Sequence, residues 1–231
     1  MINNLLCKKT NIVNYLLIVA LFALCVLGVT SNLGTNSELV FEDNILKVVE
    51  IKVSDDEQTW GYATGFFISN DGQILTNRHV VKNEATGEMY KTILVATAVD
   101  ESFLTAEVVK VSDTDDLALL RVDMQGNKYF KCAKDVSNGE RIYTIGNPSG
   151  FGLSFVEGVV SSNSRNVLHN GKTINCIQAS FVINEGNSGG PVFNRDGRLV
   201  GIISFRLKDN KNEVIHGCTF VIPVQTIQNF I

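Results

Sequence analysis

A chain of 231 residues, 45% of them hydrophobic, is long enough to bury one sizeable domain or two small lobes. Its net charge of −4, with no sustained run of lysine or arginine, argues against a nucleic-acid surface, so no nucleic-acid partner is expected. The five cysteines include no C-x-x-C pair and the three histidines are far apart, which argues against a metal site and a disulfide framework. No cofactor is expected.

The N-terminus has the pattern of an export signal. Lys8 and Lys9 precede an apolar stretch over 12–29, a length between a long signal-peptide core and a short membrane span. No lysine or arginine follows until Lys47, so the positive-inside rule exports everything after the first ten residues. Residues 1–31 are a cleaved signal peptide or a signal anchor in the inner membrane, and a buried core helix is the weaker alternative. Either export signal predicts a periplasmic or secreted protein.

After a polar linker over 32–37, short strands separated by turns follow one another with no helical period between them, which predicts an all-β barrel or sandwich. Helices are expected only at 38–46 and 224–230. A polar stretch over 123–135 divides the strands into two lobes, about 45–122 and about 136–222. The expected strands are 47–53, 62–69, 74–76, 92–99, 105–111, 117–122, 141–145, 154–162, 173–183, 199–205 and 218–222, with a hairpin over 192–203.

Glu185–Pro191 reads EGNSGGP, a serine flanked by glycines. Glycines permit a tight turn that exposes the hydroxyl and lets backbone N–H groups converge, as a nucleophilic serine requires. The run also fits G-x-S-x-G, the nucleophile elbow, but that motif needs a helix directly after the serine. Here Pro191 and a hairpin with an Asp196-Gly197 turn follow, so the elbow is rejected. An ordinary Gly-Ser surface turn remains open until partners for Ser188 are found.

A base for Ser188 is sought among the three histidines. His79 lies in LTNRHVV (75–81), where a strand ends in a short polar turn. A histidine at a strand end can face a cleft, and its neutral imidazole can accept a proton. A surface or helix-capping role for His79 is the alternative. His216, with Asp196 or Asp209, gives the chain order of the rejected elbow, and His169 is expected at a hairpin tip.

The acid that orients the base is expected in DTDDLALL, where three aspartates precede an apolar strand. Asp116 adjoins the strand and is the one best placed to be carried inward, where a carboxylate can hold an imidazole tautomer. Asp113 and Asp115 are expected to form a solvated turn.

Several segments, in one order, resemble the HtrA (Deg) serine proteases, a branch of the chymotrypsin-like fold. The similar segments are 64–81, 116–122, 145–152, 158–161, 183–191 and 217–223, so the resemblance covers roughly 45–225. It implies two six-stranded antiparallel β-barrels, with short terminal helices and an active site in the cleft between the barrels. His79, Asp116 and Ser188 are then the catalytic residues. The oxyanion loop is Gly186, Asn187 and Ser188.

The function implied by the resemblance is an exported serine endopeptidase, with 38–231 as its protease domain. It would cleave unfolded or damaged polypeptides through an acyl-enzyme, and the family's habit implies a homotrimer. The alternative from another class is a protease-fold peptide-binding or chaperone-like module, since the same cleft can hold an extended chain without cutting it.

The pocket for the residue before the scissile bond is lined, in this fold, by Val182, Ile183, Ser204, Phe205 and Arg206. No carboxylate stands at Val182, so a cationic substrate side chain would be buried without a partner. Cleavage after small or medium aliphatic residues is therefore expected. If Arg206 reached the pocket, acidic residues would be accepted.

The chain departs from the family in two ways. The PDZ domain that usually follows is absent before Ile231, so its control is expected to be missing or supplied by another protein. Glu185 stands where proline is common, beside the oxyanion loop. In addition, Asn187 replaces the aspartate of pancreatic-type enzymes, which argues against activation by a newly cut N-terminus.

Overall fold

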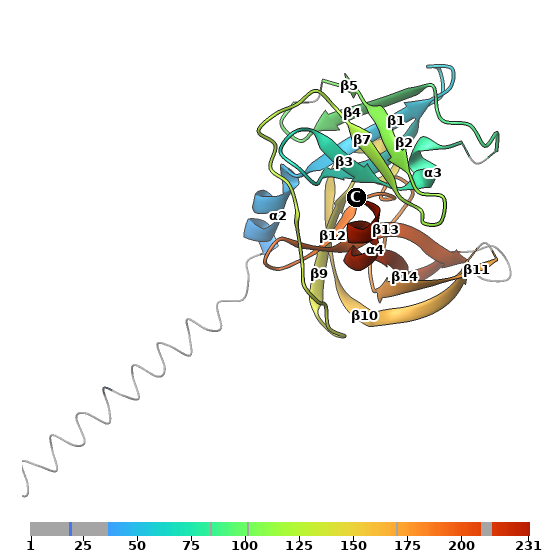
Figure 1. Cartoon of the computed structure of the whole chain (residues 1–231). Helices are drawn as coiled ribbons and strands as arrows, with labels where there is room; N and C mark the ends of the chain where they lie inside the picture. The colour runs from blue at the N-terminus through green and yellow to red at the C-terminus, as the bar shows by residue number, and fades with distance from the viewer. Residues whose placement is uncertain (1–18, 20–36, 84, 101, 170, 209–213) are drawn as a thin grey trace, which may run out of the picture. The chain divides into compact units, whose positions relative to one another are not determined.

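β-Branched and alternating segments form strands throughout the part of the chain that the computed structural model describes, namely residues 19, 37–83, 85–100, 102–169, 171–208 and 214–231 (Figure 1). Strands β1–β7, blue to green in Figure 1, form one group and the yellow-to-red strands β9–β14 form another. The predicted signal over 1–31 and almost all of the linker over 32–37 lie outside the described residues. No helix in the described ranges is long and apolar enough to cross a membrane.

The first group is a six-stranded barrel. Its sheet runs β5-β4-β1-β2-β3-β7-β6. Only Ala106 separates β5 from β6, and its N–H donates to the Ile93 carbonyl at 2.9 Å, so β5 and β6 act as one strand that joins β4 to β7 and closes the ring. The strands are β1 Val48–Ser54, β2 Gly61–Phe67, β3 Gln73–Thr76, β4 Thr92–Thr97, β5 Leu104–Thr105, β6 Glu107–Val111 and β7 Ala118–Arg121.

The second group is also a closed ring of six strands. Its sheet runs β12-β9-β10-β11-β14-β13-β8, and an additional β12–β13 pairing closes it, with β8 attached to β13 in parallel. The prediction of two six-stranded antiparallel barrels is therefore confirmed. The strands are β8 Lys131–Cys132, β9 Arg141–Gly146, β10 Ser154–His169, β11 Lys172–Ala179, β12 Pro191–Asn194, β13 Arg198–Lys208 and β14 Val214–Pro223.

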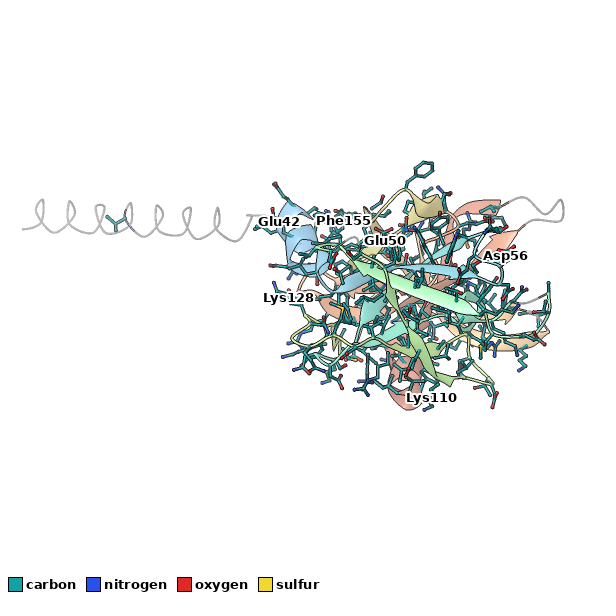
Figure 2. The ribbon with its side chains drawn as sticks, turned by 90° about the horizontal axis from the view of Figure 1, so that it is seen from above. Glu42, Glu50, Asp56, Lys110, Lys128 and Phe155 are labelled. Carbon is teal, nitrogen blue, oxygen red and sulfur yellow. The ribbon has the colours of Figure 1, made fainter. Side chains whose placement is uncertain are left out.

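Short helices lie at the ends of the domain and at one strand end. The two predicted terminal helices are present as α2 Ser37–Ile45 and α4 Val224–Phe230. The sequence did not predict α3 Arg78–Val81 or the 3-10 turn η1 Pro148–Gly150. Lys110 of β6, which Figure 2 labels, lies over the ring of Phe230 with its ammonium 4.8 Å from the ring centroid. The same ammonium binds the Phe230 carbonyl. Helix α4, which follows barrel 2 in the chain, is thus attached to barrel 1.

Several strand boundaries differ from the prediction, and the C-terminal ends of β10 and β11 differ for physical reasons that the hydrogen bonds show. Strand β10 continues seven residues past 162, because the β10–β11 hairpin keeps pairing as far as His169 and Lys172. The expected tip at His169 is therefore present. Strand β11 ends at Ala179 instead of 183, because the next carbonyls leave the ladder: that of Phe181 binds the Thr219 hydroxyl and that of Ile183 binds Arg206.

One buried cluster joins the barrels. The segment between them brings in Phe130, which is 3% exposed and packs edge-on against Phe66 of β2 at 5.6 Å between ring centroids. On its other side Phe130 contacts Phe193 of β12 at 5.2 Å. The polar stretch predicted to divide the lobes therefore contains an aromatic residue that connects their cores.

The described cysteines, Cys132, Cys176 and Cys218, are all free thiols. Cys176 is 1% exposed in barrel 2, and burial raises the pKa of its thiol to about 11. These three residues therefore form no disulfide with one another.

Because Phe130 contacts both barrels, Phe130→Ala should lower the free energy of unfolding by about 3–5 kcal/mol, the usual cost of a buried phenylalanine. Urea denaturation followed by circular dichroism measures this loss. Phe151→Ala is the matched control, since Phe151 is 90% exposed and its truncation should change stability by less than about 0.5 kcal/mol. Equal effects of the two changes would contradict the joining role of Phe130.

Candidate active site

His79 is held in place by the first turn of α3. Val80 and Val81 are buried in the core of barrel 1, so they fix this short helix at the end of β3. Asn77, fully buried, donates from its side-chain amide to the Asp116 carbonyl at 2.9 Å. The turn that carries His79 is therefore tied to the acidic turn before β7.

Of the three clustered aspartates, only Asp116 contacts His79. Its carboxylate oxygens lie 2.8 and 3.0 Å from Nδ1 of His79, and the His79 backbone N–H donates to the same carboxylate at 3.1 Å. Asp113 is exposed, and Asp115 bonds within its own turn, where its N–H binds the Ser112 hydroxyl at 3.0 Å. Both side chains of the His79–Asp116 pair are partly exposed, at 31% and 22%.

A third group reaches the same carboxylate from barrel 2. The Ser204 hydroxyl donates to Oδ2 of Asp116 at 2.7 Å. Ser204 is an extra residue in β13: Ile203 pairs with Val221 and Phe205 with Phe220, so Ser204 forms a bulge. The predicted pocket residue Ser204 thus turns its hydroxyl toward Asp116.

These contacts lower the pKa of Asp116. Burial alone would raise the pKa of the carboxyl, but the hydrogen bond and charge interaction with His79, together with the Ser204 hydroxyl, favour the ionised form more strongly. Asp116 is therefore a carboxylate at neutral pH, as is needed to hold the Nδ1–H tautomer of His79 and leave Nε2 as an acceptor.

Backbone bonds from both barrels hold the glycine-rich loop. Thr64 N–H of β2 donates to the Ser188 carbonyl at 3.0 Å, and the Thr64 hydroxyl donates to the Gly186 carbonyl at 2.7 Å. Gly189 N–H donates to Ile203, the neighbour of Ser204, at 3.1 Å. A Cβ atom on Gly189 would lie 2.3 Å from the Thr76 hydroxyl, in the strand that leads to α3. Ser188 is thus placed beside the segments that carry His79 and Asp116.

The turn before Ser188 fixes the orientation of the peptide that joins Glu185 to Gly186. Asn187 N–H donates to the Asn184 carbonyl at 3.2 Å, and Gly186 has φ +94°, as in a type II turn. The Glu185 carbonyl accepts the Ser149 N–H at 2.8 Å. In a trans peptide C=O and N–H point in opposite directions, so the Gly186 N–H faces away from Ser149. Among the described residues, neither this N–H nor that of Ser188 donates a hydrogen bond.

The remaining pocket residues lie on the two segments that the sequence paired. The side chain of Ile183 is buried, whereas that of Val182 is 62% exposed and faces solvent. Phe205 is stacked between the rings of Phe220, at 4.9 Å, and His169, at 3.9 Å. The histidine expected at the hairpin tip therefore packs on β13. The side chain of His216, the competing base, lies outside the described residues.

Sequence reasoning missed the residues that connect the parts of the site. The sequence gives Thr64, Asn77 and Arg78 no role beyond membership of a family-like segment. In the structure, the Arg78 guanidinium donates to the carbonyls of Ser112 and Asp113, at 3.1 and 3.2 Å. The partners that these residues bind across the site lie 34 to 124 residues away (188 − 64 = 124 for Thr64 and Ser188), so no local signal could have identified them. A cavity of about 450 Å³ on barrel 2 contains none of the predicted site residues; it is lined by Ala133, Asp135, Val136, Ser137, Asn163, Asn175, Ile177, Val200, Pro223, Val224 and Gln225.

Comparison with known proteins identifies the family. The model of a trypsin-like peptidase domain matches residues 63–202. The chain belongs to the trypsin-like peptidase family. A probable periplasmic serine endoprotease, DegP-like, of Pseudomonas putida (strain W619) is 36% identical over 163 residues, which are 70% of this chain and 32% of the relative. Serine endoprotease DegS of Haemophilus influenzae is 29% identical over 214 residues, covering 84% of this trypsin-like peptidase chain and 60% of DegS.

A solved structure, the HtrA-type protease AlgW with a tripeptide, matches with a TM-score of 0.71 and 25% identity, covering 82% of this chain and 60% of AlgW. The resemblance to HtrA-type proteases is therefore confirmed. The trypsin-like peptidase chain spans less than two thirds of each of these relatives.

The lowered pKa of Asp116 makes stability depend on pH. A carboxyl whose pKa is depressed by folding stabilises the fold above its unfolded pKa of about 3.9, and this contribution is lost as pH falls through the folded pKa. The difference in unfolding free energy between the native chain and Asp116→Asn should therefore have its largest value at pH 5–7 and become smaller below about pH 4. Asp113→Asn is the control with little effect. A difference that does not change with pH would contradict the ionised state of Asp116.

Asn187→Asp should destabilise the loop. Asn187 is 3% exposed and its amide donates to the Asn184 carbonyl at 3.2 Å, whereas a carboxylate would face that carbonyl as a buried, unpaired charge. We expect a loss of about 3 kcal/mol at pH 8 that becomes smaller at pH 5, where the acid can protonate. Urea denaturation at the two pH values measures it. Asn184→Asp, at an exposed side chain, should leave stability within about 0.5 kcal/mol of the native value.

Proposed function

We propose that this chain is a serine endopeptidase that hydrolyses peptide bonds of unfolded or damaged proteins, with His79, Asp116 and Ser188 as its catalytic residues. The observation that carries the proposal is the His79–Asp116 pair, in which Nδ1 of His79 lies 2.8 Å from Oδ2 of Asp116. Beside it, the loop that contains Ser188 is bound to barrel 1 through Thr64. Three segments far apart in the sequence meet there, which a surface Gly-Ser turn would not require.

In this mechanism the Ser188 hydroxyl oxygen attacks the peptide carbonyl carbon while Nε2 of His79 takes the hydroxyl proton. The negative charge of Asp116 stabilises the imidazolium. Collapse of the tetrahedral intermediate breaks the C–N bond, and His79 gives its proton to the leaving amine. A water molecule, deprotonated by His79, then attacks the acyl-enzyme ester and releases the carboxylic acid product and Ser188.

The N–H groups of Gly186 and Ser188 are the proposed donors to the oxyanion. Their support is the type II turn described above, since the Ser149–Glu185 bond holds the peptide so that Gly186 N–H faces away from it. A Cβ on Gly186 would lie 2.0 Å from the Asn147 carbonyl, so glycine is needed for this turn. In other enzymes, removal of one such oxyanion donor lowers kcat by a factor of about 10²–10³.

The substrate is proposed to bind as an extended strand. One edge of β13 pairs with β14, whereas its other edge pairs with β12 only as far as Ile202 and with Gly190 through Ile203. From Ser204 onward that edge has no strand partner among the described residues, so a polypeptide can add to it. With Val182 and Phe205 as apolar walls, cleavage is proposed after small or medium aliphatic residues.

The proposed setting is extracytoplasmic. The relative from Pseudomonas putida is described as periplasmic, and the lysine pair before residues 12–29 has the charge pattern of an export signal. Tethering to the inner membrane by 12–29, and assembly as a homotrimer, are proposed on the family resemblance. Residues 38–231 are the proposed protease domain.

Ser188→Ala tests the function. The native chain should hydrolyse casein and be labelled by a fluorophosphonate probe, whereas Ser188→Ala should do neither while keeping its circular dichroism spectrum. Ser161→Ala, at an exposed serine of β10, should behave as the native chain. Labelling that persists in Ser188→Ala would exclude Ser188 as the nucleophile. Casein binding by the native chain without any cleavage would favour the peptide-binding alternative.

A further inference from the structure

Arg206 places a cation between the two segments that flank the proposed substrate pocket. Its Nη1 donates to the carbonyl of Ile183 at 2.8 Å, so the side chain crosses from β13 to the segment that precedes Ser188. The side chain is half-buried. Ile183 is five residues before the proposed nucleophile and Arg206 is two residues after Ser204, which binds Asp116. The guanidinium is therefore a part of the site's surroundings.

The strand that carries Arg206 is held firmly. Arg206 pairs across the strands with Thr219 of β14, and the Thr219 hydroxyl donates to the carbonyl of Phe181 at 3.0 Å. Arg206 and Thr219 thus bind two alternate carbonyls of one segment, at Ile183 and Phe181. The neighbouring Phe205 is stacked between two rings. Because these contacts fix both ends of the side chain, the position of the charge is preorganised.

In the described ranges, this charge has no acidic partner. Within the described residues, the guanidinium of Arg206 forms no ion pair with any carboxylate. Among the described residues, the guanidinium binds one neutral carbonyl, that of Ile183, and this bond uses one of its five N–H donors. Val182, which precedes Ile183 in the chain, is apolar and offers this charge no partner of its own. Glu185, two residues after Ile183, is exposed and forms no ion pair in the described structure.

A half-buried arginine with free N–H donors and no carboxylate partner among the described residues is a site for a carboxylate, which it can bind through charge-assisted hydrogen bonds. We infer that Arg206 is a specificity-determining residue that accepts glutamate or aspartate before the scissile bond, in addition to aliphatic residues. This inference rests on the proposed function, because it assigns a substrate class to the same cleft. Arg206 binds the substrate side chain and takes no part in the proton transfers.

A purely structural arginine would behave differently. If Arg206 only clamped β13 to Ile183, its removal would lower the rate for all substrates alike, since the clamp is independent of the substrate. A carboxylate-binding arginine changes the ratio between a glutamate substrate and its uncharged isostere, glutamine. That ratio is therefore the measurement that separates the two roles.

The experiment compares kcat/KM for four peptide p-nitroanilides that differ only in the residue before the scissile bond: Glu, Gln, Val and Lys. For the native chain we expect Glu to exceed Gln by about tenfold or more, the usual value of a hydrogen bond to a charged group, and Lys to be the poorest. Arg206→Gln should bring the Glu:Gln ratio to about one. Arg206→Glu should lower the Glu rate further and raise the Lys rate.

Two controls make the result decisive. Arg198→Gln removes an exposed arginine at the far end of the same strand and should leave the Glu:Gln ratio at its native value. Glu185→Gln removes the neighbouring carboxylate and should raise the ratio. A native ratio of one or less, or a ratio that survives in Arg206→Gln, would overturn the inference. Labelling of Ser188 by the fluorophosphonate, with cleavage of the Val substrate, shows that the proposed function stands even then; absence of both in the native chain refutes the function itself.

Discussion

Thr64 is the residue on which the geometry of the site depends, because its backbone N–H and its hydroxyl join barrel 1 to the loops of barrel 2. Its hydroxyl donates to the Gly186 carbonyl and accepts the Asn147 N–H at 2.9 Å. Its N–H binds Ser188, and its carbonyl accepts the Thr76 hydroxyl at 2.8 Å. Since Thr64 is fully buried, water cannot replace any of these partners. One residue of β2 therefore sets the position of the serine loop relative to the strand that precedes α3.

The arrangement around Thr64 shows how two closed rings can hold a polar site. Each barrel pairs its own strands, and several bonds between the barrels join β1 and β2 of barrel 1 to loops of barrel 2. Asn147 is an example: its side-chain amide donates to the Glu50 carboxylate of β1 at 2.6 Å, and its side-chain oxygen accepts the Gly152 N–H at 2.9 Å. The loop that holds the Glu185 carbonyl is thus itself fixed by barrel 1. Such preorganisation favours electrostatic stabilisation of a transition state, because little rearrangement is needed during the reaction.

Much of this fold could be predicted from the sequence, because strand periodicity and turn residues are local signals. The hairpin tip at His169 and the helix at 224–230 follow directly from such patterns. The pairing of Asp116 with His79 was expected from the order of the motifs, and the structure brings these two side chains together. What periodicity cannot give is a bulge: Ser204 turns to Asp116 only because one extra residue interrupts the β13–β14 register. The contacts of Thr64 and Arg206 likewise depend on how distant segments meet.

The free thiols have a consequence for how this domain responds to a reducing agent. Both rings are closed by hydrogen bonds between strands, and the three described cysteines contribute no covalent link to that closure. Cys176, with its raised pKa and its 1% exposure, stays almost wholly protonated at neutral pH and is a poor nucleophile toward oxidants or other thiols. The described fold therefore rests on no covalent cross-link, and its stability should be the same with and without dithiothreitol.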